Sequence, residues 1–479
     1  MARKLPDWVE KHKREGVEIR LQRGNYYAYE VTSKWDPELG RSRKITKAYL
    51  GAVKNEGIVP ARIRRQQTYG GALDAGNLRY LAPFLDAIEP SVQEYFPADW
   101  QSIMAAAALR LCYLEPCSRL RLRYETSLAK RRWPEAHLSD DALPGLLRRI
   151  GFKWDAQREV FAALAKDEKH MAIDLSHVFS ESQNIPWLEY GHNGDGVWRA
   201  QLQVLLCWGT TTHRPGFLQL LLGATNSAQV IAHAVKEAPI QDLVAVVDRG
   251  FWSPENVQAF EEERVHYVMV LPCDLPFVRH ASHAEYAQSF LHKGHTQWWR
   301  KDEWEGRAVY HYWDKRIAAD QEDTWMRRIE KAPDDEARAH LVKEYEDAKP
   351  RLGVLHLLTD TGLDAAATFA LYKERNQVEE GYNALQNALD ADVTYMRSRE
   401  GMIGLHFIFF LALHLYSQVL AHLKRKRLLT TYSVRDVLTY LTKVVVVEVD
   451  GHDMALPVTR QTETVVRKLE VPITEKSGL

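Results

Sequence analysis

The stretch that decides the fold is LVAVVDRGF, residues 243–251. Five apolar residues, three of them valine, lead directly into an aspartate, which is the pattern of a buried strand that ends in a polar side chain. Ser253 and Pro254 suit the cap and the first position of a following helix, so Asp248 is not needed as that cap. We therefore expect Asp248 to project from the carboxyl end of its strand, where α/β sheets place their sites.

A second aspartate, Asp174, lies in the apolar segment Met171–Ser176. A carboxylate there is costly unless it is exposed at a strand end, hydrogen-bonded or bound to a cation. Three antiparallel-looking strands are followed by alternating helix and strand, an order that matches a ribonuclease-H-like sheet of the α/β class. These segments are the strands 171–176, 201–208 and 216–222, the helix 228–236, and the strands 243–247 and 266–271.

A third acid, Glu379, lies on a helix predicted from Ala365 to Leu389. Tyr372, Arg375 and Gln386 recur with it at spacings of three, four and seven residues, which places them on one stripe of that helix. A polar stripe of this kind would be unfavourable on the buried face of a core helix. It favours a face that lines a cleft and meets phosphate and metal.

Three convergent carboxylates repel one another and need a cation to share. Hard divalent ions prefer oxygen ligands, and Mg²⁺ binds through few carboxylates together with substrate phosphate. Two such ions can activate a water or a 3′-hydroxyl and stabilise the departing oxygen. For each acid taken alone, a helix cap or a surface ion pair is the competing interpretation. All three acids together, in this strand order, favour the metal site.

At these residues the sequence resembles the DDE transposases of bacterial insertion sequences, in the group that carries a Tyr-x2-Arg-x3-Glu-x6-Lys signature. The signature reads Tyr372, Arg375 and Glu379 here, with Gln386 in place of the lysine. That change removes a phosphate-binding charge but no metal ligand. Four further blocks resemble family segments, namely residues 173–176, 223–227, 246–253 and 396–413.

The resemblance implies a ribonuclease-H-like catalytic core with Asp174, Asp248 and Glu379 as catalytic metal ligands for two Mg²⁺ or Mn²⁺ ions. It implies double-stranded DNA as the partner, both as terminal inverted repeats and as target, and cut-and-paste strand cleavage and transfer. At least a homodimer would assemble on two transposon ends. The DNA-binding candidates are Tyr372, Arg375, Gln386, Arg249, Trp298 and Trp299.

Residues Cys273–Lys349 break the alternation of helix and strand, and they are polar and rich in tryptophan. We interpret them as an insertion that is partly β and separate from the core sheet. In the family that the sequence resembles, a tryptophan of this insertion would stack on a flipped base, which contributes about 1–3 kcal/mol. For each candidate, a core or surface role is the competing interpretation. The candidates are Trp298, Trp299, Trp304, Trp313 and Trp325.

We predict five regions from these patterns. Residues 1–76 are strand-rich, with strands at 26–31 and 44–50, and residues 77–165 are helical and expected to bind DNA. The catalytic core comprises 166–272 and 350–425, interrupted by the insertion 273–349, and the C-terminal region 426–479 could serve oligomerisation. The helix predicted at 138–150 could face DNA or simply pack against the core.

The chain has 479 residues and a formal net charge of −1, which does not by itself indicate nucleic-acid binding. Four basic runs could neutralise phosphates or could be solvated helix faces. They are residues 62–65, 119–123, 130–132 and 424–427.

The four cysteines form no C-x-x-C pair, which argues against a zinc site or a disulfide framework. The first residues lack the apolar core of a signal peptide. Polar residues interrupt the longest apolar stretch, Met402–Leu420, so we predict a buried core helix and no membrane segment. A cytoplasmic, nucleoid-associated location in a bacterium fits these features.

Two other function classes compete with an active transposase. One is a catalytically inactive, transposase-derived DNA-binding protein, and the other is a ribonuclease-H-like nuclease without strand transfer. The three intact acids argue against the first, and the insertion and the Tyr-Arg-Glu stripe argue against the second.

Overall fold

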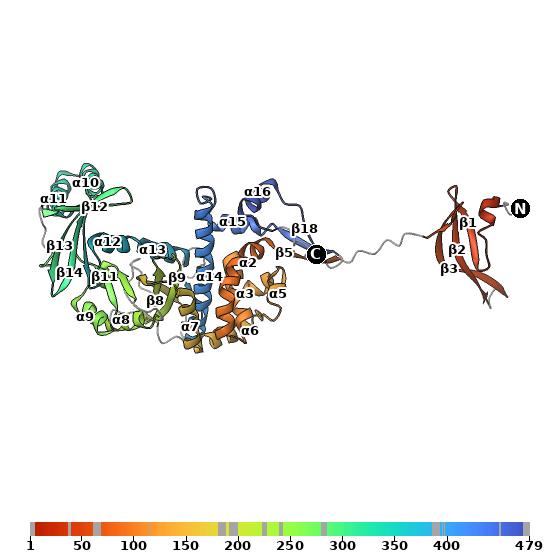
Figure 1. Ribbon diagram of the computed structural model, residues 1–479, viewed down its shortest axis with the longest axis horizontal. Coiled ribbons are helices and arrows are strands. Elements are labelled where there is room, and N and C mark those ends of the chain that lie inside the picture. Colours follow the sequence, from red (N-terminus) through yellow and green to blue (C-terminus); the bar gives the residue numbers. More distant parts are fainter. Residues whose placement is uncertain are drawn as a thin grey trace. The chain divides into compact units, whose positions relative to one another are not determined.

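The structure is a computed structural model. It describes residues 5–36, 40–60, 69–113, 115–180, 188–190, 200–222, 228–238, 243–278, 285–385, 393–394, 396, 398–449 and 452–472. The chain divides into two compact units (Figure 1). The first comprises Met1–Tyr69 with Val449–Gly451, and the second comprises Gly70–Glu448 with His452–Leu479.

The first unit is an antiparallel sheet in the order β1-β2-β3-β4, preceded by a short helix. The strands predicted at 26–31 and 44–50 lie inside β2 and β3. A small core of Val9, Ala28 and Val53 holds the helix on the sheet. The elements are α1 Asp7–Glu10, β1 Val17–Gln22, β2 Asn25–Asp36, β3 Arg41–Lys54 and β4 Gly57–Val59.

The described residues of the second unit form an eleven-stranded mixed sheet, so the chain is of the mixed α/β class. The main path runs β12-β13-β14-β15-β11-β10-β6-β8-β7, with β9 paired to β8 and β16 to β6. Each core strand predicted from the sequence is present. The strands are β6 His170–Ser180, β7 Glu189–Tyr190, β8 Ala200–Gly209, β9 Pro215–Leu221, β10 Val244–Val247, β11 His266–Val270, β12 Gln288–His292, β13 His295–Trp304, β14 Arg307–Trp313, β15 Val354–Thr359 and β16 Val393–Thr394.

Helices cover this sheet and build a separate helical part beside it (Figure 1). The helices that follow core strands are α8 Ala228–Lys236, α9 Pro254–Glu262, α12 Ala365–Lys373 and α13 Asn376–Asn383. The helical part contains α2 Gly76–Tyr95, α3 Trp100–Tyr113, α4 Leu120–Glu125, α5 Ala129–Arg132, α6 Ala142–Phe152, α7 Trp154–Ala165, α14 Arg399–Arg425, α15 Val434–Leu441 and α16 Arg460–Leu469.

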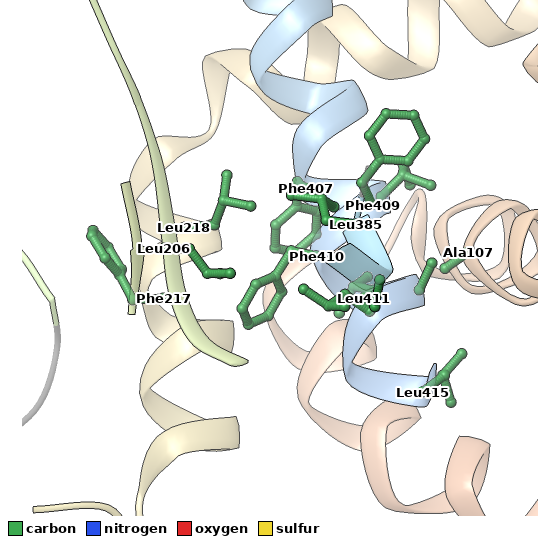
Figure 2. Packing of buried hydrophobic residues seen from close by; sticks show 14 of the residues in the cluster. Ala107, Leu206, Phe217, Leu218, Leu385, Phe407, Phe409, Phe410, Leu411 and Leu415 are labelled. Carbon is green, nitrogen blue, oxygen red and sulfur yellow. The ribbon is translucent and has the colours of Figure 1, made fainter. Parts of the chain in front are cut away.

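Helix α14 joins the helical part to the sheet, because it packs on α3 and α6 on one side and on β9 on the other. Its length and composition would let it cross a membrane, but 83% of its most apolar window is buried inside the protein. The prediction of a buried core helix at 402–420 is confirmed. Figure 2 shows the cluster around it, including Phe407, Phe409, Phe410, Leu411 and Leu415 of α14, Leu206, Phe217 and Leu218 of the sheet, Ala107 of α3, and Leu385.

Several polar side chains of α14 form hydrogen bonds within the helix. Ser417 Oγ donates to the His414 carbonyl at 2.8 Å, and His406 Nδ1 lies 2.9 Å from the Met402 carbonyl oxygen. Burial lowers the pKa of His406 to about 4, so its imidazole is neutral at pH 7. The interruptions that argue against a membrane segment in the sequence are therefore parts of the core.

Two glycines set the close approach of α6 to α14. A Cβ on Gly404 would lie 2.0 Å from the Leu147 carbonyl oxygen, and one on Gly151 would lie 1.8 Å from the Glu400 carbonyl oxygen. Both contacts are to backbone atoms, which cannot move aside cheaply. The helix predicted at 138–150 thus has a packing face on α14, and its Arg148 is exposed.

The segment Cys273–Lys349 is partly β, as predicted, but its predicted separation from the core sheet is wrong. β14 pairs antiparallel with β15, which also pairs with β11, so β12, β13 and β14 extend the core sheet at its edge. Tyr310 and Tyr312 of β14 share a buried cluster with Val246 of β10 and Val268 of β11. The remainder of the segment contains the helices α10 Lys315–Glu330 and α11 Asp335–Ala348, of which α10 was not predicted.

The C-terminal region packs back on the helical part. α15 contacts α2, α3 and α14, and a small sheet in the order β18-β17-β5 joins it to the chain before α2. Its strands are β5 Tyr69–Asp74, β17 Val445–Val449 and β18 His452–Ala455. The pairing of β5 with β17 was not predicted, because the two segments are far apart in the sequence.

Several of the basic runs are neutralised inside the protein. Arg131 pairs with Glu448 and Asp453 at 2.9 and 2.6 Å, and Arg132 pairs with Asp86 and Glu89. Other ion pairs join Arg121 to Glu125, Arg123 to Glu115, Lys424 to Glu380 and Lys426 to Glu470. The run 62–65 lies outside the described residues. Where these ion pairs form, they favour a structural role over phosphate binding.

The glycine contact between α6 and α14 gives a stability prediction. Gly404→Ala should lower the free energy of unfolding by about 1–3 kcal/mol, because overpacking pushes the helices apart. Gly145→Ala on α6 is the matched control, since its Cβ would meet only the tip of Arg149 at 3.4 Å. It should be neutral or stabilising by up to about 1 kcal/mol. Urea unfolding of both variants measures the difference, and equal stabilities would contradict the assigned packing.

Candidate active site

Two of the predicted acids, Asp174 and Asp248, occupy matching positions on adjacent strands because β10 runs parallel to β6. Val244 pairs with His170, an offset of 74 residues (244 − 170), and the same offset separates Asp248 from Asp174 (248 − 174). Asp248 follows β10 directly, and Asp174 lies within β6. Matching residues on adjacent strands lie about 5 Å apart and share a face of the sheet.

The carboxylate of Asp248 is not used as a helix cap, as predicted. Ser253 Oγ accepts a hydrogen bond from Asn256 N at 3.0 Å and caps α9, with Pro254 at the first helical position. Asp248 itself begins a short 3₁₀ turn, Arg249–Phe251, and its side chain is 43% exposed. It can therefore project from the strand end toward other groups.

Glu379 reaches the aspartates from α13, which packs on β6 and β8. The prediction of one continuous helix from Ala365 to Leu389 was wrong, because a turn at Glu374 and Arg375 separates α12 from α13. There Arg375 N donates to the Tyr372 carbonyl at 3.0 Å, three residues back instead of four. This tighter hydrogen-bonding pattern, typical of a 3₁₀ turn, interrupts the α-helix at the buried arginine. Residues 386–389 lie outside the described residues.

The approach of α13 to the sheet depends on Gly381. A Cβ at this position would lie 2.6 Å from the Trp208 ring of β8. A larger residue would push α13 outward, and Glu379 with it, away from the aspartates.

The guanidinium of Arg375 links the acids. It lies 3.0 Å from Asp248 Oδ2 and 3.0 Å from Glu379 Oε1, and its side chain is only 8% exposed. Arg375 donates a hydrogen bond to Glu379, and hydrogen bonds between charged groups are the strong ones. It forms an ion pair with Asp248. Arg375 therefore takes the place of the shared cation that three neighbouring carboxylates require.

Asp174 is the most buried of the three acids and also senses this arginine. The pKa of Asp174 is raised to about 6, mainly by burial. The positive charge of Arg375 and a hydrogen bond from Leu175 N act to lower this pKa, and the charges of Asp248 and Glu379 act to raise it. Arg375 therefore interacts electrostatically with all three predicted acids.

The donor set suits a hard divalent cation, since the three acids offer only carboxylate oxygens. Within the described ranges, no three His, Cys, Asp or Glu side chains lie close enough together to hold an ion as they stand. Asp248 and Glu379 instead point at Arg375. The residues fit a metal ion by donor type, and to hold one Asp248 and Glu379 would have to turn away from Arg375.

The predicted DNA-binding residues are distributed unevenly about these acids. Tyr372 is partly buried beside them, and burial raises its pKa, with Arg375, Asp248, Arg249 and Glu379 as its charged neighbours. Arg249 is exposed. Arg375 is buried between two acids and does not stand free for phosphate. Gln386 lies outside the described residues.

Trp298 and Trp299 lie on opposite faces of β13. Trp299 packs on the buried cluster that contains Tyr310, Tyr312, Val246 and Val268, and its ring centroid lies 5.9 Å from that of Tyr310. Trp298 lies under Lys315 Nζ, 4.6 Å from its ring centroid. The other predicted candidates also have neighbours: Trp304 stacks on Phe277, Trp313 lies near Tyr286, and Trp325 lies under Arg328.

The double ion pair of Arg375 was missed in the sequence analysis, which assigned this side chain to phosphate. The available signal was the spacing of Arg375 and Glu379, because opposite charges four residues apart on a helix commonly pair. The second partner, Asp248, is 127 residues away along the chain (375 − 248) and follows only from the tertiary fold.

A family model described as "Transposase DDE domain" matches residues 165–415. That range covers more than half of the chain. The chain belongs to the transposase DDE domain family. No curated protein sequence matches it. Among solved structures, this DDE-family chain is similar to the one described as "Cryo-EM structure of piggyBac transposase synaptic complex with hairpin DNA", at 13% identity and a TM-score of 0.38, over 80% of this chain and 81% of the other.

The Arg375 pairing generates a prediction for metal binding. In Arg375→Gln the acids lose the competing cation, so Mn²⁺ should stabilise the variant at a concentration about ten- to a hundredfold lower than in the parent. The estimate follows from the roughly 1.5–3 kcal/mol that a hydrogen bond to a charged group contributes. Thermal unfolding over a Mn²⁺ titration gives the midpoint. Arg307→Gln, which breaks an ion pair with Glu261 elsewhere on the sheet, is the control. An unchanged Mn²⁺ midpoint in Arg375→Gln would contradict competition between arginine and metal.

Proposed function

We propose that this chain is a DNA transposase of an insertion sequence, which binds terminal inverted repeats and catalyses metal-dependent strand cleavage and strand transfer by a cut-and-paste route. The observation that carries the proposal is the gathering of Asp174, Asp248 and Glu379 around one point of positive charge at Arg375. Membership of the transposase DDE domain family supports the same reaction class.

The catalytic core is proposed to be ribonuclease-H-like. The support is the strand order β9-β8-β6-β10-β11, in which three antiparallel strands are followed by two that run parallel to the first. This order brings a mid-strand acid on β6 beside a strand-end acid after β10. We keep the other regions predicted from the sequence. Residues 273–349 are an insertion that continues the core sheet, 77–165 are the DNA-binding helical region, and 426–479 are an oligomerisation region.

In the proposed reaction Asp174, Asp248 and Glu379 hold one or two Mg²⁺ or Mn²⁺ ions. Such ions, when bound, activate a water or a 3′-hydroxyl and stabilise the departing oxygen. Arg375 neutralises Asp248 and Glu379 in their absence, which keeps the acids close together. Once released from the acids, its guanidinium has the geometry to bind a phosphate with two hydrogen bonds.

Arg249 and Tyr372, near the acids, are the proposed contacts to the cleaved DNA end. Gln386 is a further proposed DNA contact. Arg249 is exposed and adjacent to Asp248, and the phenol of Tyr372 can donate to a phosphate oxygen. Trp298 and Trp299 remain proposed base-stacking residues. Trp298 is favoured, because Trp299 is packed against Tyr310 in a hydrophobic cluster.

The proposed partners are the two inverted-repeat ends and a target duplex, held by at least a homodimer in the synaptic complex. The proposed location is the cytoplasm of a bacterium, at the nucleoid. An assay on paired DNA ends distinguishes the alternatives: an inactive descendant only binds, a nuclease only cuts, and a transposase both cuts and joins.

Substitution of the acids tests the proposal. Glu379→Gln and Asp248→Asn should each lower the rate of strand nicking about a thousandfold or more, because a catalytic metal ion contributes several kcal/mol to transition-state stabilisation. DNA binding should stay nearly intact. The substrate is a duplex carrying the DNA that flanks the coding region, in Mg²⁺.

Glu380→Gln is the matched control for Glu379→Gln. Glu380 is the next residue on α13, is exposed, and pairs only weakly with Lys424 at 3.5 Å. It should nick DNA at the parent's rate. Full nicking by Glu379→Gln or Asp248→Asn would remove these acids from the catalytic site.

A further inference from the structure

A cavity of about 470 Å³ lies between the turn after β10, which begins next to Asp248, and the hairpin of α10 and α11. Three arginines from three different elements line it. Arg249 comes from the turn after Asp248, Arg328 from α10, and Arg351 from the 3₁₀ turn after α11. The other lining residues are neutral: Cys273, Gln321, Thr324, Trp325, Ala348 and Leu352.

The three guanidiniums have no acidic partner within the described part of the chain. Arg351 donates only to the Asp347 carbonyl, at 2.9 Å, and Arg328 lies over the Trp325 ring at 4.5 Å from its centroid. By contrast, two arginines of β13 and β14 are paired with acids, Arg300 with Asp302 and Arg307 with Glu261. Three unpaired cations around one cavity repel one another, so they favour a bound anion.

Arg249 connects this cavity to the acids. Its charge is felt by Tyr372, which also senses Asp248 and Glu379, and by the Cys273 thiol inside the cavity. The charge of Arg351 acts on the same thiol. An extended anion that passes the acids can therefore continue along Arg249 into the cavity.

We propose that this cavity binds phosphate groups of one DNA strand next to the acidic site, an inference that rests on the proposed function. Guanidiniums bind phosphate with paired hydrogen bonds, which accounts for three arginines and no acid in the lining. Arg328 is held at the wall of the cavity by its position over the Trp325 ring. The role of the hairpin α10–α11 is then to carry two of the three phosphate ligands.

The test measures how DNA affinity depends on salt. Each phosphate contact contributes about 0.9 to the slope of log K against log salt. The double variant Arg328→Gln/Arg351→Gln should therefore lose about two units of slope. The probe is duplex DNA of arbitrary sequence over a NaCl series in EDTA, so that binding is measured without cleavage.

The matched control is Arg327→Gln/Lys331→Gln, which removes two exposed cations of the same hairpin that do not line the cavity. It should keep the parent's slope. All four side chains are exposed, so neither variant should lose its fold, and thermal unfolding verifies this.

The outcomes separate this inference from the proposed function. A double variant with the parent's slope overturns the phosphate site while the transposase proposal stands. In another outcome, the parent and the control share a slope and the double variant loses two units, but the parent does not nick DNA in Mg²⁺. That result supports the phosphate site and contradicts the proposed activity. If inorganic phosphate stabilises the parent but not the double variant, and the DNA slopes agree, the cavity takes free phosphate and the DNA assignment is wrong.

Discussion

Like charges on neighbouring strands repel, and the parallel pairing of β6 with β10 places Asp174 and Asp248 at the same level of the sheet. Glu379 on α13 adds a third carboxylate to that place. The arrangement needs a positive charge, and Arg375 supplies it from a buried position between Asp248 and Glu379. The turn before α13 and the glycine that faces Trp208 both follow from this requirement, because each lets α13 bring an arginine and a glutamate close to the strand ends.

The local chemistry of the site could be predicted from the sequence. An apolar run that ends in Asp248, with a separate cap at Ser253, shows that the carboxylate is free, and this depends only on residues within one strand and one turn. The core strands could be predicted for the same reason. The partners of Arg375 could not be predicted from the sequence. The helical stripe indicates that its charge faces a site, but it does not show whether the arginine binds phosphate or Asp248 there.

Long-range pairing accounts for most of what the sequence did not show. The break in helix–strand alternation at 273 is real, but a sheet edge accepts any strand that offers free backbone groups and a suitable apolar face. β14 offers both, with Tyr310 and Tyr312 packed beside Val246 and Val268, and so it joins β15. The basic runs were ambiguous for a related reason: only the fold shows that Arg131 and Arg132 meet acids from distant segments.

The position of helix α14 in the sequence determines when the core can close during synthesis. All three acids precede it in the sequence, yet the apolar surfaces of β9, α3 and α6 are covered only when residues 399–425 are in place. During synthesis the ribosome therefore releases the acids and their strands before the element that closes their core. A nascent chain, or one truncated before 399, leaves that surface open to water and prone to aggregation, because transiently exposed apolar surface drives association. Only a chain translated through residue 425 can bury that surface.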